Sequence, residues 1–341
     1  MTRWKPGGED RWTGLVGETE HSNLAHAPEW FGAIQDAYGH TPLYLQAEDS
    51  DGHLAVLPAF LVRSRIFGTV VASMPFLDGG GPCGTAGDLA NIAVQSLVEE
   101  AGRLGAGSVE LRSTVEIDLP VPALKDKVNL VVALPTDAGE LWGHLDARVR
   151  NQVRKAERSG LSVEFSHREG LGAFYDVFAV NMRDLGSPVH ARAFLATILE
   201  AFADRARVGL VRKGPTVIGG LIALAFKDTL VVPWASCLRE YSALCPNMLV
   251  YWETLAAACR EGFRRFDFGR STRDSGTYRF KRQWGALEVP LYCYQIPIRP
   301  GGGRSLSPTD SRGALLVALW RRLPVGVTRS VGPRVRKYLT Q

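Results

Sequence analysis

The stretch that decides the fold is residues 262–295, GFRRFDFGRSTRDSGTYRFKRQWGALEVPLYCYQ. Apolar side chains alternate at Phe266 and Phe268, a pattern typical of a buried strand, which is predicted to stop at Gly269. A polar loop, residues 270–275, follows, and residues 291–296 resume a strand after a run of interleaved aromatic and basic residues. Because polar groups at the end of a buried strand often form sites, we expect chemistry here.

The same order of elements occurs twice in the chain. Each half reads helix, three strands, helix, strand, although the residues of the halves do not match. In the first half we predict helices at residues 28–38 and 88–104 and strands at residues 43–47, 54–62, 69–74 and 109–111. In the second half we predict helices at residues 171–185, 191–205 and 246–260 and strands at residues 208–211, 217–226, 230–235 and 266–268. The pattern favours a duplicated α/β architecture with mixed sheets, in which the strand after each helix runs parallel to the strand before it.

Length and composition indicate a globular protein of two domains, because 341 residues with 45% hydrophobic content can fill two cores of ordinary size. No apolar run approaches the roughly 20 residues that a membrane span needs, and the first twelve residues lack the apolar segment of a signal peptide. We therefore expect a cytoplasmic location. The five cysteines form no CxxC pair, so we predict neither a disulfide framework nor a metal site.

The net charge of +5 is distributed unevenly. Residues 299–341 hold nine Lys or Arg and one acid, a balance of +8, whereas the rest of the chain holds 31 basic and 34 acidic residues, a balance of −3. A slightly acidic body argues against nucleic-acid binding by bulk charge, and the basic tail is the segment suited to an anionic surface.

A charged helix is predicted between the halves, from about Leu141 to Gly160. Its Arg150, Arg154 and Arg158 are spaced i, i+4, i+8 and therefore share one face. That face is either simply solvated or a phosphate-binding ridge at the domain junction, because arginine forks suit anionic oxygens.

The tail opens with a Pro/Gly/Ser-rich linker and continues with Leu, Val and Trp mixed with Arg and Lys. Such a composition suits peripheral contact with an anionic membrane through residues 315–339, at the inner membrane face. The alternative is that the apolar residues dock on the body and the basic residues are solvated. Pro324 and Pro333 are expected to break the segment into short helices.

Four motifs, read in order, carry a resemblance to a known family. They are RVRNQVRKAERSG at residues 148–160, NMRDLGSPVH at residues 181–190, FDFGRSTRDSGTYRFKRQWGA at residues 266–286, and the tail pair LWRRLP and VGPRVRKYL. Together they resemble the FemAB family, and most closely its branch associated with exosortase and PEP-CTERM exopolysaccharide systems. The resemblance covers most of the chain. It implies two tandem GNAT-like acyltransferase domains and, as in better-known relatives, transfer of an amino acid from aminoacyl-tRNA to an amine of a peptidoglycan precursor.

Two departures leave the acyl donor open. GNAT enzymes that use acetyl-CoA carry a [QR]xxGx[GA] turn before the helix that follows the splayed strands, where backbone amides hold the pyrophosphate. The equivalent turn here, residues 239–247, contains no glycine, and only the loop at residues 79–84 could replace it, unless that loop is a plain turn. The chain also lacks the long helical-hairpin insertion that some relatives use as a tRNA-facing arm. We expect no permanently bound cofactor, and the donor is either aminoacyl-tRNA or acyl-CoA.

The resemblance assigns one catalytic residue. Lys281 matches the lysine of the family's F-K-x-x-[FW]-G segment, which implies that it steadies the donor carbonyl and its developing oxyanion. The alternative is a surface lysine paired with Asp274 or Glu288. Asp274 is also a candidate base that orients the amine, although an α-amine is already partly neutral near pH 7.

Further candidates surround that lysine or lie at helix breaks. Arg270 and Ser271 follow the strand end and could hold a phosphate or a sugar, unless Arg270 pairs with Asp267. Tyr278 and Trp284 could stack on a sugar or base, or belong to the core. The predicted substrate-binding residues, the charged helix included, are Arg150, Arg154, Arg183, Arg270, Ser271, Tyr278 and Trp284. Asn247 is expected to cap its helix.

These observations predict a GNAT-like domain at residues 1–135, a second one with the catalytic segment at residues 136–298, and a linker and basic tail at residues 299–341. The predicted function is acyl or aminoacyl transfer to an amine of an anionic, soluble or lipid-linked cell-envelope or exopolysaccharide precursor, with tRNA as a further partner if it is the donor. The alternatives are a CoA-dependent N-acetyltransferase and a non-catalytic scaffold of the envelope machinery.

Overall fold

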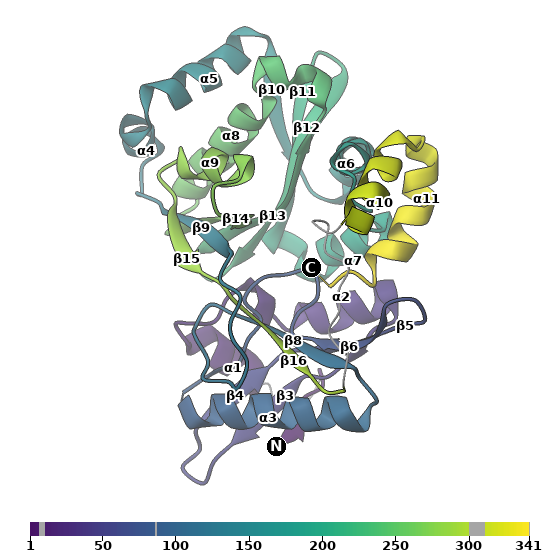
Figure 1. The fold of residues 1–341 in the computed structure, drawn as a ribbon. Coiled ribbons are helices and arrows are strands. Elements are labelled where there is room, and N and C mark those ends of the chain that lie inside the picture. Colours follow the sequence, from purple (N-terminus) through teal and green to yellow (C-terminus); the bar gives the residue numbers. More distant parts are fainter. Residues whose placement is uncertain (7–10, 86, 300–310, 341) are drawn as a thin grey trace. The chain divides into compact units, whose positions relative to one another are not determined.

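The computed structural model describes residues 1–6, 11–85, 87–299 and 311–340 (Figure 1). The chain divides into two compact units. Unit 1 comprises Met1–Val128, Val289–Leu306 and Lys337–Gln341, and unit 2 comprises Asn129–Glu288 and Ser307–Arg336. Both units combine helices with sheets of mixed strand direction, so the predicted mixed α/β class is confirmed.

Unit 2 is built on a seven-stranded sheet in the order β10-β11-β12-β13-β14-β9-β15. β10 to β13 pair antiparallel in succession, and β14 runs parallel to β13, as the order of elements predicted. β12 is buried along most of its length, as a central strand should be. The strands are β9 (Lys127–Ala133), β10 (Leu161–Ser166), β11 (Ala206–Lys213), β12 (Thr216–Phe226), β13 (Thr229–Cys237), β14 (Arg265–Thr272) and β15 (Leu287–Pro290).

The helices of unit 2 cover both faces of this sheet (Figure 1). α8 packs on β10 to β13 and carries α4 and α5, whereas α6 packs on β11 to β13. The predicted charged helix is in fact two helices, because Asp146 begins a new one by accepting a hydrogen bond from the Arg148 amide at 2.7 Å. The helices are α4 (Ala138–His144), α5 (Ala147–Arg158), α6 (Leu171–Leu185), α7 (Arg192–Phe202), α8 (Pro246–Arg260) and α9 (Gly276–Arg282), with 3-10 helices η2 (Arg168–Gly170), η3 (Ala203–Arg205) and η4 (Arg239–Leu244).

Unit 1 holds a five-stranded sheet in the order β16-β8-β6-β5-β2 and a four-stranded sheet in the order β1-β3-β4-β7. Helix α3 supplies Leu97 and Ala101 to a core with Val109 and Leu111 of β8. The helices are α1 (Arg11–Glu18), η1 (Leu24–His26), α2 (Glu29–Tyr38) and α3 (Gly87–Arg103). The strands are β1 (Thr2–Arg3), β2 (Thr41–Pro42), β3 (Leu45–Glu48), β4 (Leu54–Leu57), β5 (Phe60–Ser64), β6 (Gly68–Ala72), β7 (Cys83–Gly84), β8 (Ser108–Ser113) and β16 (Tyr292–Pro297).

Two of the predicted strands differ from the structure in a way that has a clear local cause. The run at residues 54–62 is divided by Pro58 into β4 and β5, which belong to different sheets, because proline cannot donate a ladder hydrogen bond. The strand expected to stop at Gly269 continues to Thr272, because Gly269 adopts a φ of +74° as an irregularity inside β14 and does not end it. Arg270 and Ser271 are therefore strand residues.

Strands β9 and β16 do not belong to the units in which the predicted domain boundaries place them. β9 precedes most of unit 2 in sequence and joins the sheet of unit 2 beside β14, whereas β16 follows unit 2 and pairs antiparallel with β8 in unit 1. Tyr294 of β16 anchors this strand, because its hydroxyl both accepts from the Ile117 amide and donates to the Ile117 carbonyl. A boundary at residue 136 or 299 thus does not separate the compact units.

The basic tail forms two helices, α10 (Ser311–Arg322) and α11 (Val325–Arg336), which pack on α6 in unit 2. Pro324 separates them as predicted, but the expected break at Pro333 is wrong, because Pro333 lies inside α11. The predicted linker falls on residues 300–310, outside the described residues. Among the residues that the structure describes, no helix combines the length and apolar character needed to cross a membrane.

Candidate active site

The candidate site lies where the parallel strands of unit 2 part. Over the described residues of both strands, β13 and β14 pair only at Thr229↔Arg265, Leu230↔Phe266 and Val231↔Asp267. Beyond these residues β13 runs on to Cys237 and β14 to Thr272 without pairing to each other. Asp267 fixes the point of divergence, because its Oδ1 accepts a hydrogen bond from the Gly269 amide at 2.7 Å.

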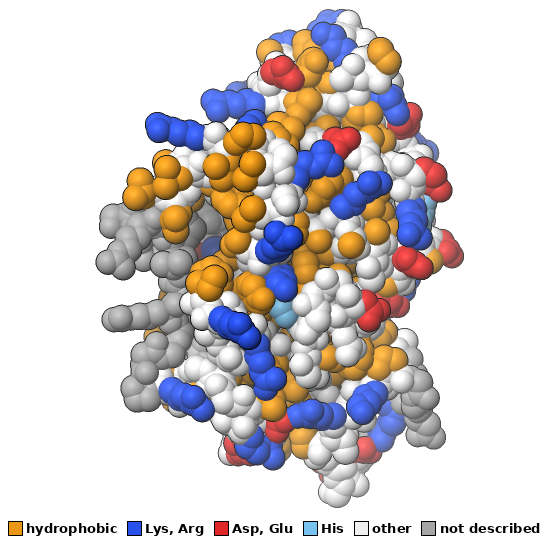
Figure 2. All heavy atoms as spheres, turned by 90° about the vertical axis from the view of Figure 1, so that its right-hand side faces the viewer, with side chains coloured by type: hydrophobic (Ala, Val, Ile, Leu, Met, Phe, Trp, Pro, Cys, Tyr) orange, Lys and Arg blue, Asp and Glu red, His pale blue; other side chains and the backbone are white. Residues whose placement is uncertain are grey.

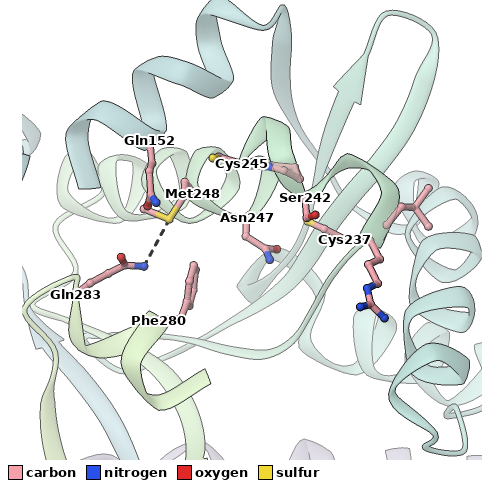
Figure 3. Close-up of a pocket in the computed structure, with 11 residues that line it drawn as sticks. Gln152, Cys237, Ser242, Cys245, Asn247, Met248, Phe280 and Gln283 are labelled. Atoms are coloured by element: carbon pink, nitrogen blue, oxygen red, sulfur yellow. Dashed lines mark hydrogen bonds between the residues drawn. The ribbon is translucent and has the colours of Figure 1, made fainter. Parts of the chain in front are cut away.

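A cavity of about 260 Å³ lies at the end of β13 (Figure 3). It is bounded by the end of β13, η4, the first turn of α8, one side chain of α5, one of α9 and the residue that follows α9. That residue, Gln283, donates to the Met248 sulfur at 3.6 Å, which links the end of α9 to α8. The lining residues are Gln152, Cys237, Leu238, Arg239, Ser242, Cys245, Pro246, Asn247, Met248, Phe280 and Gln283.

The chemistry of the cavity is neutral to cationic. Of the described residues that line it, Arg239 carries the one charge, and amide, hydroxyl and thiol groups supply the other polar atoms. Burial raises the pKa of the Cys237 thiol to about 12, so this thiol is neutral at pH 7. An uncharged or anionic group therefore fits this cavity better than a cation does.

The start of α8 differs from the expectation for Asn247. Cys245, with a φ of +60°, is the N-cap residue and Pro246 is the first helical residue, so Asn247 lies one position further on and lines the cavity. Cys245 thus occupies a left-handed position that favours glycine. Proline at the first helical position costs no hydrogen bond, because that amide has no acceptor within the helix.

Lys281 is buried, with 9% of its surface exposed, rather than paired at the surface. Its Nζ donates to the carbonyls of Gly269 at 3.0 Å and Arg270 at 2.8 Å, so it ties α9 to the divergent end of β14. The alternative partner Glu288 binds Arg273 and the Tyr278 hydroxyl instead. Lys281 precedes the cavity-lining residue Gln283 by two positions in the sequence.

Trp284 belongs to an aromatic cluster beneath the site, and Tyr278 does not. Trp284 is 1% exposed and packs on Phe268 and Phe280 at ring centroid distances of 6.5 and 6.3 Å. Tyr251 of α8 joins the cluster, and burial raises its pKa well above its ordinary value. Tyr278 lies at the surface, where the hydrogen bond to Glu288 raises the pKa of the tyrosine and lowers that of the carboxyl.

The other residues predicted around β14 do not line the cavity. Asp274 is exposed in a turn with a φ of +61°. Ser271 is 4% exposed, and its hydroxyl has no hydrogen-bond partner among the described residues. Buried hydroxyls without a partner, like that of Ser271, are rare in proteins and are usually bound by water or by a ligand. Arg270 is half-buried.

The three arginines predicted on helices have structural contacts. Arg150 donates to the carbonyls of Trp142, Gly143 and Leu145 and so caps α4. Arg154 lies over the Trp142 ring at 5.4 Å. Arg183 binds Asp184 and the Leu323 carbonyl, toward the tail. None of these three arginines lines the cavity.

Sequence reasoning missed several cavity residues, among them Gln152, Cys237, Ser242 and Gln283. Three of these lie inside segments that the sequence singles out: Gln152 and Gln283 in the quoted motifs, and Ser242 in the turn before α8. None of these residue types is distinctive by itself. Only the fold brings α5, η4 and α9 to one cavity.

The glycine loop of unit 1 is packed and not an open phosphate cradle. The carbonyl of Gly79 accepts from Asn23 at 2.8 Å, and the carbonyl of Gly81 meets His26 Nε2 at 2.9 Å. A Cβ added at Gly81 would lie 2.7 Å from the Ser113 side chain. These glycines permit close packing, so the loop does not replace the missing turn of unit 2.

Comparison with known proteins agrees with this architecture. Residues 144–282, which lie in unit 2, match the model of the acetyltransferase (GNAT) domain. No curated protein matches the chain. Among solved structures, FemX is similar with a TM-score of 0.65 and 14% identity over 88% of this chain and 98% of that chain.

Two further structures are similar at the same 14% identity. The C-terminal domain of a putative lysylphosphatidylglycerol synthetase from Agrobacterium fabrum has a TM-score of 0.56 over 90% of this chain and 93% of that chain. The L-PGS structure from Bacillus licheniformis has a TM-score of 0.54 over 95% of this chain and 97% of that chain. The chain therefore has a FemAB-like tandem GNAT fold, whose second domain matches the acetyltransferase (GNAT) family.

Proposed function

We propose that the protein is an N-acyltransferase whose donor enters the cavity of unit 2. The observation that carries this proposal is the divergence of β13 and β14 beside a neutral to cationic cavity, in the segment that matches the GNAT domain. Parting the strands exposes main-chain polar groups that a donor can bind. A cavity of about 260 Å³ accommodates an acyl or aminoacyl group and the beginning of its carrier.

The reaction joins an amine nitrogen to the donor carbonyl carbon and breaks the bond from that carbon to the carrier. The amine must be uncharged when it attacks, and it loses its proton to water or to the departing carrier. Negative charge develops on the carbonyl oxygen, where Ser242, Asn247 and Gln283 offer N–H and O–H donors. Asp274, which lies in an exposed turn, is not needed as a base for an amine that is already partly neutral.

Lys281 is the proposed stabiliser of the developing negative charge. Two of the three N–H groups of its ammonium bind main-chain carbonyls, so the proposed effect acts through the buried positive charge and through the fixed position of β14. Burial strengthens this effect, because the Lys281 side chain is itself shielded from water.

The preferred donor is aminoacyl-tRNA. In its favour, the turn before α8 has no glycine and begins α8 with proline, so it offers a poorer backbone cradle for a pyrophosphate. FemX and the lysylphosphatidylglycerol synthetase structure share the fold. The proposed acceptor is an amine of an anionic or lipid-linked envelope or exopolysaccharide precursor. Acyl-CoA is the second candidate donor, because the segment at residues 144–282 matches an acetyltransferase domain.

The test is donor binding by the purified full chain and by a variant with a blocked cavity. Thermal stability is followed with acetyl-CoA and, separately, with charged tRNA. Ser242→Trp fills the cavity, and Ser50→Trp, in an exposed turn of unit 1, is the matched control. We expect charged tRNA to raise Tm for the parent and for Ser50→Trp but not for Ser242→Trp.

Other outcomes separate the alternatives. A rise with acetyl-CoA alone, lost in Ser242→Trp, would replace aminoacyl-tRNA by acyl-CoA. If neither donor raises Tm, and Lys281→Ala keeps its cellular role, the acyltransferase proposal fails and the non-catalytic scaffold replaces it.

A further inference from the structure

The two tail helices expose an apolar stripe that ends in an arginine on each helix. Leu315, Leu319 and Arg322 of α10 are spaced i, i+4, i+7, and all three are exposed, the leucines at 62% and 52%. Leu316 lies beside them and is 56% exposed. On an ordinary surface helix such leucines would face the core. Here no described residue covers them, and exposed apolar patches of this kind often mark interaction surfaces.

α11 repeats the pattern. Val327, Val331 and Arg334 share the same i, i+4, i+7 spacing, and the valines are 42% and 38% exposed. Figure 2 looks onto this side of the molecule and shows hydrophobic side chains together with Lys and Arg on the surface. We call these two stripes, with Leu316, the tail face.

The tail helices are held with this face outward. On the inner side, Arg329 of α11 pairs with Asp176 of α6 at 2.7 Å and lies over the Tyr175 ring. Gly332 packs closely on Val189, since a Cβ added at Gly332 would lie 3.0 Å from the Val189 amide. Similar contacts hold α10, where a Cβ at Gly186 would collide with Val317.

Charge selects what can cover the tail face. Residues 311–341 contain no Asp or Glu, while Arg322 and Arg334 are exposed and have no ion-pair partner among the described residues. A second copy of the chain, packed through the same face, would bring arginines against arginines. Nucleic acid would satisfy the arginines but leave the leucines without apolar contacts. An anionic lipid surface offers acyl chains to the leucines and phosphates to the arginines.

We propose that the tail face rests on an anionic membrane surface, with the leucines of α10 inserted among the lipids. The body of the protein then stays in the aqueous phase beside that membrane. This inference does not depend on the proposed acyl transfer, because it uses residues of α10 and α11 and none of the cavity.

The experiment measures binding of the full chain to vesicles by co-sedimentation. One set contains equal parts of phosphatidylglycerol and phosphatidylcholine, and the other contains phosphatidylcholine alone. We expect binding to the anionic vesicles, weakened by salt, and little binding to the neutral ones. The double variant Leu315→Ser/Leu319→Ser should bind at least about tenfold more weakly, since removing one inserted leucine costs about tenfold.

Arg322→Glu should have a lower affinity than the parent for anionic vesicles and the same affinity for neutral ones. Ile66→Ser is the matched control, because Ile66 is 84% exposed but lies in unit 1. Circular dichroism and thermal melts show whether each variant is folded.

Two results would overturn the proposal. One is that Leu315→Ser/Leu319→Ser binds anionic vesicles as well as Ile66→Ser does. The other is that the parent does not bind vesicles but dimerises in light scattering, and the double variant is monomeric, which would make the tail face a contact between copies.

Discussion

Each unit contains a parallel strand pair whose second strand follows a helix. The two pairs differ in whether the strands stay together beyond the paired residues. In unit 1, β6 and β8 pair at Val70↔Ser108, Val71↔Val109 and Ala72↔Glu110, and the Ser73 amide continues the ladder to the Glu110 carbonyl at 2.8 Å. In unit 2, β13 and β14 pair only at their first three residues, and most of each strand lies beyond the point where they separate. The same order of elements thus gives one closed pair and one open pair.

A buried cation lies at each of these ends, and the two cations bind different strands. Arg112 of β8, 3% exposed, donates to the carbonyls of Met74 and Leu77, which follow β6, and so ties the two strands together. Lys281 donates to two carbonyls of the same strand, β14. This contrast supports the proposal that the donor enters unit 2, where the strand pair is open.

The largest predicted effect is on the closed pair. Arg112→Met should lower the free energy of unfolding by about 3–5 kcal/mol, because it leaves Glu110 and two buried carbonyls without their partner. Denaturant unfolding measures the change. Arg103→Met is the control, since Arg103 forms an exposed pair with Glu100 worth at most about 1 kcal/mol. Equal effects of the two variants would contradict the role given to Arg112.

The corresponding change at the open pair should affect transfer more than folding. We expect Lys281→Met to cost about 1–3 kcal/mol of stability, from two unsatisfied carbonyls, and at least about 100-fold in acyl transfer. The measurements are denaturant unfolding and turnover with the donor that binds. Lys155→Met, on the exposed side of α5, should change neither. A stable variant with full turnover would limit Lys281 to a structural role.

Packing of the glycine loop in unit 1 gives the third prediction. Gly81→Ala should destabilise the protein by about 1–3 kcal/mol, because the new Cβ would overlap the Ser113 side chain. Donor binding in unit 2 should persist. Gly276→Ala is the matched control, since a Cβ there meets nothing within 4 Å, and its effect should stay within about 1 kcal/mol. Loss of donor binding in folded Gly81→Ala would place the loop in the site after all.

Acid should weaken the docking of the tail in unit 2. Burial, and then the charge of Arg336, holds the pKa of His190 well below its ordinary value, and His190 Nε2 accepts a hydrogen bond from Arg336 at 3.0 Å. The unfolded chain therefore binds a proton below about pH 6.5 that the folded chain does not. Stability should fall by up to about 1.4 kcal/mol per pH unit below that value. Unfolding from pH 5 to 8 measures this slope, which should shrink in His190→Gln.

The smallest predicted effect concerns the turn before α8. Cys245→Gly should change stability by no more than about 1 kcal/mol, because glycine relieves the left-handed strain but loosens the unfolded chain. Cys245→Val should lower Tm clearly more, since a β-branched residue fits this conformation poorly. Thermal melts of the two variants compare them, and equal Tm values would remove the argument from strain.

The sequence predicted the repeated order of elements well, because apolar periodicity and local turns are properties of short segments. For Trp284 it left two roles open, stacking on a ligand or packing in the core. The contacts of Trp284 with Phe268 and Phe280 show that it packs in the core. It was wrong about the end of β14 and about Asn247, since both depend on single φ values at Gly269 and Cys245. The membership of the exosortase-associated branch stays a prediction.

By itself the sequence determined the mixed α/β class, the duplication, the basic tail and the aromatic and basic segment around Lys281, because each follows from residues that are close in the sequence. Only the tertiary structure decided which half holds the open strand pair, which carbonyls Lys281 binds, and which sheets β9 and β16 join. The physical reason is that these features depend on contacts between residues far apart in the chain. The hydrogen bonds from Arg112 to the Met74 and Leu77 carbonyls, for example, join residues 38 and 35 positions apart in the chain.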